Sequence, residues 1–380
     1  MRRIRSTPLL LALALALPGM AEAAAGVEAC DVPPRFGVEA TAAAIVRTAC
    51  QEHRLWLRPF IEADGRLAAL GVTEAERARL YDEVTPAWQR VAQYWRESGT
   101  LSSMAGGGTP GAASCMYPGA SREVDNDCRA FLVDNPWSAA FISWVMTRAP
   151  LPGFAGSPRH MDYVARAWRH PESSPYLYAD PFSGKPAPGD MLCFLRANDH
   201  GLGAAGLREA LSGRGRMPAR SHCEIVVASN LGGDQTLYLI GGNVLNAVVM
   251  RKLPLDRSGR LVPGALGPAV AGAGAAEAQA AAADLARTAA LTPPAMHAQA
   301  PAGSGGDTAE DSATPIGATC RPGDPAACSF NRRDWAVLLK LKPQSQLGGF
   351  VPVAVEPAAP AAPGDAETVP EDAPAPESPV

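Results

Sequence analysis

A largely apolar pattern at helical spacing runs from Asp134 to Arg148 and reads DNPWSAAFISWVMTR. Its large side chains recur at helical spacing. After Pro136 the few polar positions are Ser138, Ser143, Thr147 and Arg148. Pro136 suits the first position of a helix and disfavours the α conformation in the residue before it, so Asn135 is the expected N-cap. The pattern predicts a helix that is buried on most sides.

Helical spacing also appears before and after this stretch. Residues 39–58 carry apolar positions at helical spacing, and TEAE at residues 73–76 has the form of a capping box that opens a second helical region. Pro86 should kink or split that second region. Residues Met161 to Trp168 predict one further helix on the C-terminal side of the central one.

Beyond residue 188 the apolar positions take the spacing of short strands joined by tight turns. The predicted strands are Met191–Leu195, Cys223–Ala228, Thr236–Ile240, Val244–Arg251 and Trp335–Leu341. Between them, GGD at residues 232–234 predicts a hairpin turn, and GGN at residues 241–243 predicts the next turn. Short successive strands of this kind indicate an antiparallel sheet or a small barrel, so the chain as a whole predicts an α+β fold.

Composition divides the chain further. Residues 1–23 combine a basic start, an apolar run and an Ala-Glu-Ala site, which is the form of a secretory signal peptide. Residues 263–319 are rich in Ala, Gly and Pro, and residues 351–380 form an acidic tail without Lys or Arg. Both segments predict disorder. The expected order is signal peptide 1–23, N-terminal helical region 24–97, core 98–262, insertion 263–319, final strand of the core 320–350 and tail 351–380.

Charge and hydropathy exclude several classes of partner. The formal net charge is −4. It becomes −6 without residues 1–23, which carry three arginines and one glutamate. No basic stripe indicates a nucleic acid partner. The apolar run of the signal peptide is too short to span a bilayer, and no later segment is long and apolar enough. The sequence therefore predicts an exported protein, periplasmic or secreted, without a membrane span.

The eight cysteines of an exported chain indicate disulfides. Local pairing would join Cys30 to Cys50, Cys115 to Cys128 and Cys320 to Cys328, leaving Cys193 with Cys223. This is one of about 105 arrangements that eight cysteines allow. No cysteine or histidine set has the spacing of a zinc site, so we expect neither a metal nor another cofactor.

Three residues are candidates for chemistry. Ser138 lies in the first turn of the predicted central helix, where backbone N–H groups and the helix dipole favour negative charge. His222 precedes a strand, and Asn243 lies in the Gly-Gly-Asn turn. A hydroxyl nucleophile needs a base, and the base needs an orienting partner, so these types in this order suit a hydrolytic site. Each also has an ordinary interpretation, as a serine at a helix start, a strand-edge histidine and a turn asparagine.

Two neighbours of His222 offer alternatives. Cys223 is a rival nucleophile, but adjacent residues on a strand point to opposite faces, so His222 cannot readily activate it. Glu224 shares a face with His222. It is either an orienting partner of the histidine or a solvated charge.

Several of these motifs resemble those of known enzymes. WSAAFISWV at residues 137–145 is similar to the pattern W-C-A-A-F-V-S-W-V of CHAP-type enzymes. PGDM at residues 188–191, HCEIV at 222–226 and GN at 242–243 resemble their P-G-D-L turn, G-H-V-G-I strand and following G-N. The chain thus resembles the papain-like amidase and peptidase superfamily of bacterial cell-wall enzymes, the CHAP and NlpC types. More closely, PWSAAFISWV, HCEIVV and GGNV resemble the bacterial domain of unknown function 2272, over roughly residues 85–262 and 330–342.

The resemblance implies a papain-like core, in which a buried helix with the nucleophile at its N-terminus packs on a small antiparallel sheet or barrel, with additional helices before it. It implies a cell-envelope amidase or peptidase that acts on peptidoglycan or another envelope amide or ester, with Ser138, His222 and Asn243 as the catalytic residues. This chain carries Ser138 where the superfamily carries cysteine. A hydroxyl is not ionised as a thiol is, so Ser138 would need general-base help from His222.

Two further hypotheses stay open beside the hydrolase. The same scaffold could be a catalytically inactive module that binds the envelope. Alternatively, the protein could recruit partners through the insertion at 263–319 and the acidic tail at 351–380. A serine-directed probe separates the hydrolase from both.

Overall fold

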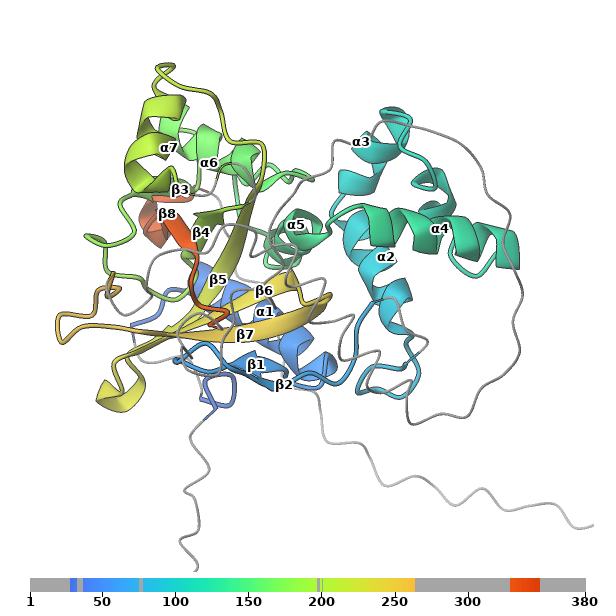
Figure 1. The fold of residues 1–380 in the computed structure, drawn as a ribbon, viewed down its shortest axis with the longest axis horizontal. Helices are drawn as coiled ribbons and strands as arrows, with labels where there is room; N and C mark the ends of the chain where they lie inside the picture. Colours follow the sequence, from blue (N-terminus) through green and yellow to red (C-terminus); the bar gives the residue numbers. More distant parts are fainter. Residues whose placement is uncertain are drawn as a thin grey trace, which may run out of the picture.

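Figure 1 shows the computed structural model of the chain, which describes residues 28–32, 37–74, 78–196, 199, 201–263 and 329–348. These residues form an α+β fold of seven α-helices and one eight-stranded sheet, as the sequence pattern predicts at this level. The expected signal peptide, the Cys320–Cys328 bond and the acidic tail lie outside the described residues, as does the expected insertion apart from Pro263.

The sheet is mixed and open rather than a small antiparallel sheet or barrel. Its strands are β1 Phe60–Ile61, β2 Leu67–Ala69, β3 Tyr176–Ala179, β4 Met191–Leu195, β5 Ser221–Ser229, β6 Thr236–Val244, β7 Ala247–Pro254 and β8 Asp334–Leu341. They lie in the order β2-β1-β7-β6-β5-β4-β8-β3, and every neighbouring pair is antiparallel except β1 with β7. The region 24–97, expected to be helical, therefore also supplies the two strands at one edge of the core sheet.

The strands β4 to β8 largely follow the predicted ranges, but the Gly-Gly-Asn segment does not form a turn. Residues 241–243 continue β6, and the chain reverses at Leu245 and Asn246, which have φ angles of 52° and 58°. The two glycines serve close packing instead: a Cβ on Gly242 would lie 2.5 Å from the Phe141 ring. A glycine pair is typical both of a turn and of close packing within a strand, and only the tertiary structure distinguishes these two roles.

The last strand has an internal place in the sheet. β8 follows residues 264–328 in the chain, yet it pairs with β4 on one side and β3 on the other. Its residues Asp334 to Leu339 are all buried. β8 therefore joins β3 to the rest of the sheet.

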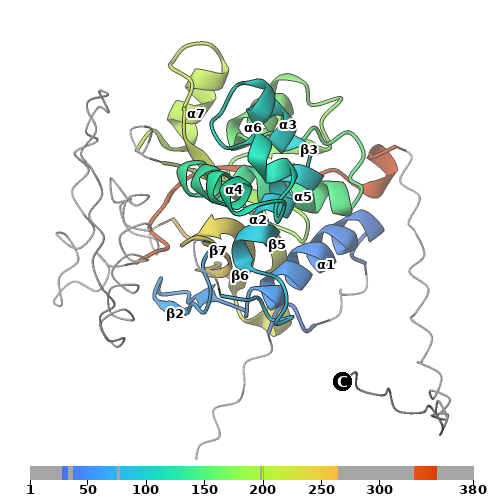
Figure 2. The same cartoon turned by 90° about the vertical axis from the view of Figure 1, so that its right-hand side faces the viewer.

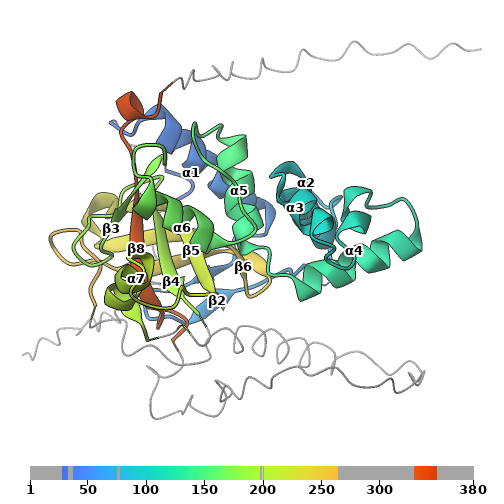
Figure 3. The same cartoon turned by 90° about the horizontal axis from the view of Figure 1, so that it is seen from above.

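The helices are α1 Ala40–Leu55, α2 Ala87–Glu97, α3 Thr100–Gly106, α4 Arg122–Asp134, α5 Ser138–Arg148, α6 His160–Arg169 and α7 Gly203–Leu211. α5 is central: α2, α3 and α4 gather on one side of it and the sheet lies on the other (Figures 1 and 3). It packs against β5 and β6 and against α1 and α2; Figure 2 shows α1 alongside the strands. Residues Ser138 to Met146 are all buried, which confirms the predicted central helix.

Two helix starts differ from the prediction. Asn135 caps the C-terminus of α4, because its side-chain amide donates to the Phe131 carbonyl, and α5 begins at Ser138 with Trp137 at the N-cap position. The TEAE segment does not start a helix in its described residues, 73 and 74. A bridge between Arg79 and Pro86 occupies the following stretch, so α2 begins only after Pro86.

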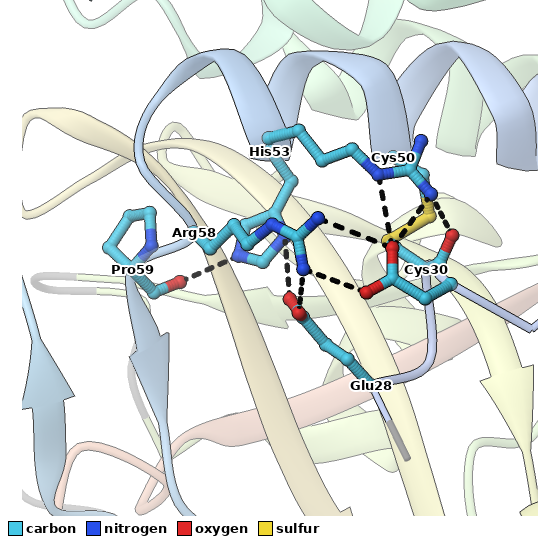
Figure 4. Close-up of polar contacts among 8 residues, drawn as sticks. Glu28, Cys30, Cys50, His53, Arg58 and Pro59 are labelled. Atoms are coloured by element: carbon cyan, nitrogen blue, oxygen red, sulfur yellow. Dashed lines mark hydrogen bonds and ion pairs between the residues drawn. A yellow bond between two sulfur atoms is a disulfide. The ribbon is translucent and has the colours of Figure 1, made fainter. Parts of the chain in front are cut away.

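Three of the expected disulfides are present: Cys30–Cys50, Cys115–Cys128 and Cys193–Cys223. The first anchors residues 28–32 to α1. Beside it the Arg58 guanidinium bonds to both Glu28 and Asp31 (Figure 4). The neighbouring His53 donates a 2.9 Å hydrogen bond from Nε2 to the Pro59 carbonyl, and burial lowers the pKa of His53 to about 4. The His53 ring is therefore neutral and carries its proton on Nε2.

Candidate active site

Ser138 is the first residue of α5 and is buried, with 4% of its surface exposed. Its Oγ lies 2.7 Å from Nε2 of His160, the first residue of α6. The backbone N–H groups of the first helical turn have no acceptor within the helix, so they add partial positive charge around Ser138. The structure thus places a hydroxyl, an imidazole and a helix N-terminus together.

The other nitrogen of His160 is also bound. Nδ1 forms a hydrogen bond with the Tyr163 hydroxyl, one helical turn along α6. Burial first, and then the charges of His222 and Arg196, lower the pKa of His160 well below its usual range. Burial likewise raises the pKa of Tyr163 well above its usual range. Both groups are therefore neutral near pH 7, and the ring nitrogen facing Ser138 can act as an acceptor when Nδ1 carries the proton.

His222 contacts the ring of His160 and forms no hydrogen bond with Ser138 among the described contacts. The two imidazole rings are 5.3 Å apart between centroids, and His222 Nε2 lies 3.5 Å from Glu224 Oε1. Glu224 in turn pairs with the Arg251 Nε at 2.9 Å on β7. Burial acts to raise the pKa of Glu224, but the charges of Arg251 and His222 outweigh it and hold that pKa at about 2.

The two glycines of β6 pack against different parts of the site. A Cβ on Gly242 would contact Phe141 of α5, whereas a Cβ on Gly241 would lie 3.1 Å from His222 Nε2 and 2.8 Å from Glu224 Cγ. Neighbours on a strand face opposite sides, so Gly241 faces His222 and Glu224, and Gly242 faces α5. Among the described residues the hydrogen-bond partner of Ser138 is His160, and the expected Ser138–His222 pair is not formed.

Asn243 is also placed differently from the expectation. It is half-buried near the end of β6, with a φ angle of 56°, and not in a turn. In the described part of the chain no hydrogen bond joins it to Ser138 or His222. The backbone conformation is one that asparagine tolerates better than most residues, which explains its presence there.

Sequence reasoning missed His160 and Tyr163. His160 opens the helix predicted from Met161, and Tyr163 follows three residues later on the same side. The spacing of three residues between His160 and Tyr163 can be read from the sequence. Nothing in the sequence links either residue to Ser138, because 22 residues and an irregular loop separate His160 from it. Only the packing of α6 brings them together.

The close approach at Gly242 gives a stability prediction. Gly242→Ala should lower the free energy of unfolding by about 1–3 kcal/mol, since the added methyl cannot fit beside Phe141 without moving α5. Gly106→Ala is the control, because a Cβ there meets no atom within 4 Å. Urea denaturation of both variants measures the difference. Equal stability of the two would show that α5 and β6 are less tightly packed.

A cavity of about 760 Å³ adjoins the site on the side of α6. Its walls include Asn135 and Pro136, which directly precede α5, and Tyr163, which bonds to His160. Ser138 and His160 themselves do not line it. The volume is in the range of small-ligand pockets, and Tyr163 connects the cavity to the buried pair.

Across the described residues no group of three or more His, Cys, Asp or Glu side chains is arranged to hold a metal ion. None of the described helices is long and apolar enough to cross a membrane.

The chain was compared with curated proteins, with solved structures and with models of protein families. No curated protein and no solved structure matches the chain. One family model does match, over residues 82–341, which is more than half of the chain and includes every residue of the site described above. The chain belongs to the bacterial family described as "Uncharacterized protein conserved in bacteria (DUF2272)".

Proposed function

We propose that the protein is an exported hydrolase of amide or ester bonds in the cell envelope, with Ser138 as nucleophile and His160 as general base. The 2.7 Å contact between Ser138 Oγ and His160 Nε2 at the start of a helix carries this proposal. Tyr163 takes the part of the orienting residue, because it binds the other ring nitrogen. His222 contacts the His160 ring, and Glu224 lies next to His222.

In this mechanism Ser138 Oγ attacks the substrate carbonyl carbon while its proton passes to His160 Nε2. The carbonyl electron pair moves to oxygen, and N–H groups of the first turn of α5 stabilise the negative charge there. Collapse of this intermediate breaks the bond to the leaving amine or alcohol, which takes the proton from His160. Water then attacks the acyl-Ser138 ester, again with His160 as base, and releases the acid.

The low pKa of His160 has a consequence for this chemistry. The ring loses its proton more readily than a free histidine, so the base form persists into acidic solution. The charges of His222 and Arg196 contribute to that effect. We infer that His222 acts on the reaction through the pKa of His160, as a positioning and tuning residue.

The papain-like arrangement and the substrate class belong to the same proposal. A central helix with its N-terminal side chain at the site, packed on β5 and β6 and followed by a histidine at the start of β5, supports a papain-like core. Envelope amides such as those of peptidoglycan are the substrates that this resemblance implies. The three disulfides are consistent with export.

One observation favours an inactive envelope-binding module instead. Ser138 is 4% exposed and does not line the adjoining cavity. A buried Ser138–His160–Tyr163 group would then be a satisfied polar cluster of the core, and the cavity would bind without turnover.

Labelling with a fluorophosphonate separates the two functions. The hydrolase should be labelled on Ser138, and His160→Gln should slow labelling by about 10²- to 10⁴-fold, the usual contribution of a general base. His222→Gln should have a smaller effect, mainly on the pH profile. Ser143→Ala is the matched control, because Ser143 is buried in the same helix but bonds to Ser157 rather than to a histidine. Absence of labelling at Ser138 in the folded wild type would favour the binding module.

A further inference from the structure

The cavity beside Tyr163 is lined by an arginine that pairs with none of the described carboxylates. Arg166 lies one helical turn beyond Tyr163 on α6, is half-buried and lines the cavity. No carboxylate in the described part of the chain forms an ion pair with it. A partly desolvated guanidinium that faces a cavity is a ready partner for an anion, since it offers paired donors in a planar fork.

The other charges on this wall are already paired. Arg159 and Asp162 form an ion pair, with Nη2 and Oδ1 3.2 Å apart, and Asp162 also accepts a hydrogen bond from Ser157 Oγ. Asp162 is therefore not available to neutralise Arg166. Arg159, Asp162 and Arg166 together give this side of the cavity one net positive charge, and Arg166 carries the charge that is not paired.

The position of Arg166 sets the distance to the reacting bond. His160 and Arg166 are six residues apart on one helix, which is about 9 Å along its axis at 1.5 Å per residue. An extended peptide covers that distance in about two or three residues. The cavity also has apolar walls, at Trp95 and Met104, that suit the chain between the two ends.

We propose that this cavity binds a carboxylate of the substrate through Arg166. The substrate class is then a peptide-like amide or ester whose carboxylate lies two or three residues from the bond that is cleaved. This inference rests on the proposed hydrolase function, because it takes Ser138 as the reacting centre. It adds the part of the substrate that determines specificity.

The test compares p-nitrophenyl esters of dicarboxylic acids, from succinate to suberate, with the same esters carrying a terminal carboxamide. Wild type should prefer the longer carboxylate esters. Arg166→Met should raise KM for them by about 10- to 100-fold, as expected for a lost hydrogen bond to a charged group, and leave the carboxamide esters unchanged. Arg166→Lys should recover part of the loss. Arg169→Met is the control, because Arg169 lies on the same helix, is exposed and does not line the cavity.

The outcomes separate the two proposals. Turnover that depends on Ser138 but does not distinguish carboxylate from carboxamide, or an equal loss for both in Arg166→Met, would overturn the role of Arg166 and leave the hydrolase intact. If no ester is cleaved and Ser138 is not labelled, the hydrolase fails. Calorimetric titration of Ser138→Ala with suberate and with its diamide then decides the anion site. Binding of suberate alone, abolished by Arg166→Met, supports it, and equal or absent binding rejects it.

Discussion

Arg251→Met should lower the free energy of unfolding by about 3–5 kcal/mol, the cost of breaking a buried ion pair by removing one partner. Arg251 and Glu224 are 1% and 0% exposed, and the Arg251 Nε lies 2.9 Å from the carboxylate. Arg251 Nη1 also donates to the Phe330 carbonyl and to Asn331, just before β8. Its loss would leave Glu224 ionised in the core and free the start of the last strand.

Two further variants test this cause. Lys252→Met removes the adjacent ion pair of β7, with Glu62, whose side chains are 26% and 36% exposed. It should cost less than about 1 kcal/mol. The double variant Glu224→Met with Arg251→Met removes both charges of this pair, so it should be more stable than Arg251→Met alone. Urea denaturation at pH 7 measures all three. A double variant as unstable as the single one would show that the contacts of Arg251 with residues 330 and 331 dominate.

The same pair predicts acid sensitivity. The pKa of Glu224 is held at about 2, below its unfolded value of 4.5, so the folded protein binds its proton less readily. The stability from this group is present above pH 4.5 and is lost as the pH falls toward 2, by about 3 kcal/mol. Replacing Glu224 and Arg251 together should therefore make the free energy of unfolding depend less on pH below pH 4.5.

Glu74→Gln should stabilise the protein in alkaline solution, by up to about 5 kcal/mol at pH 9. Glu74 is 3% exposed, and burial raises its pKa from 4.5 to about 8, with the Trp137 indole acting in the opposite direction. Its Oε2 has no hydrogen-bond partner among the described residues. The folded state holds this proton more tightly than the unfolded state, so stability falls as the pH rises from 4.5 through 8.

At pH 5 the glutamic acid is neutral in the folded protein, so Glu74→Gln should differ little from wild type there. Denaturation at pH 5, 7 and 9 therefore gives a difference that grows with pH. Glu209→Gln provides the matched control, because Glu209 is exposed on α7, and it should follow the wild-type curve. A constant offset of Glu74→Gln at all three pH values would show that packing, and not the charge, causes the change.

The sequence predicted the elements whose physics is local. The apolar period of residues 137–146 predicts a buried helix, and the alternation from Met191 onward predicts strands. The pairing of Cys193 with Cys223 followed from short spacing among the other cysteines, and the two residues do lie opposite each other on β4 and β5. The helix and the strands depend mainly on residues close in the chain, whereas the disulfide joins residues 30 apart.

The partners of the site depended on the tertiary structure. The sequence identifies Ser138 from its place in the first turn of a helix, which Pro136 two residues before it indicates. Its hydrogen-bond partner, His160, comes from a separate helix whose docking depends on the packing of many distant residues. His222 carries the stronger sequence motif, but in the structure its ring contacts the rings of His160 and Phe194, and the hydrogen bond of Ser138 goes to His160.

The sequence by itself determined the α+β class, the central helix with Ser138 at its start, the strands from β4 to β8 and three disulfides. The tertiary structure decided the sheet order, the internal place of β8, the use of Gly241 and Gly242 as contact points and the choice of His160 over His222 beside Ser138. The physical reason is the range of the interactions. Helix caps, apolar periodicity and short loops act within a few residues, whereas strand order and side-chain contacts between elements depend on how all of the apolar faces are buried together.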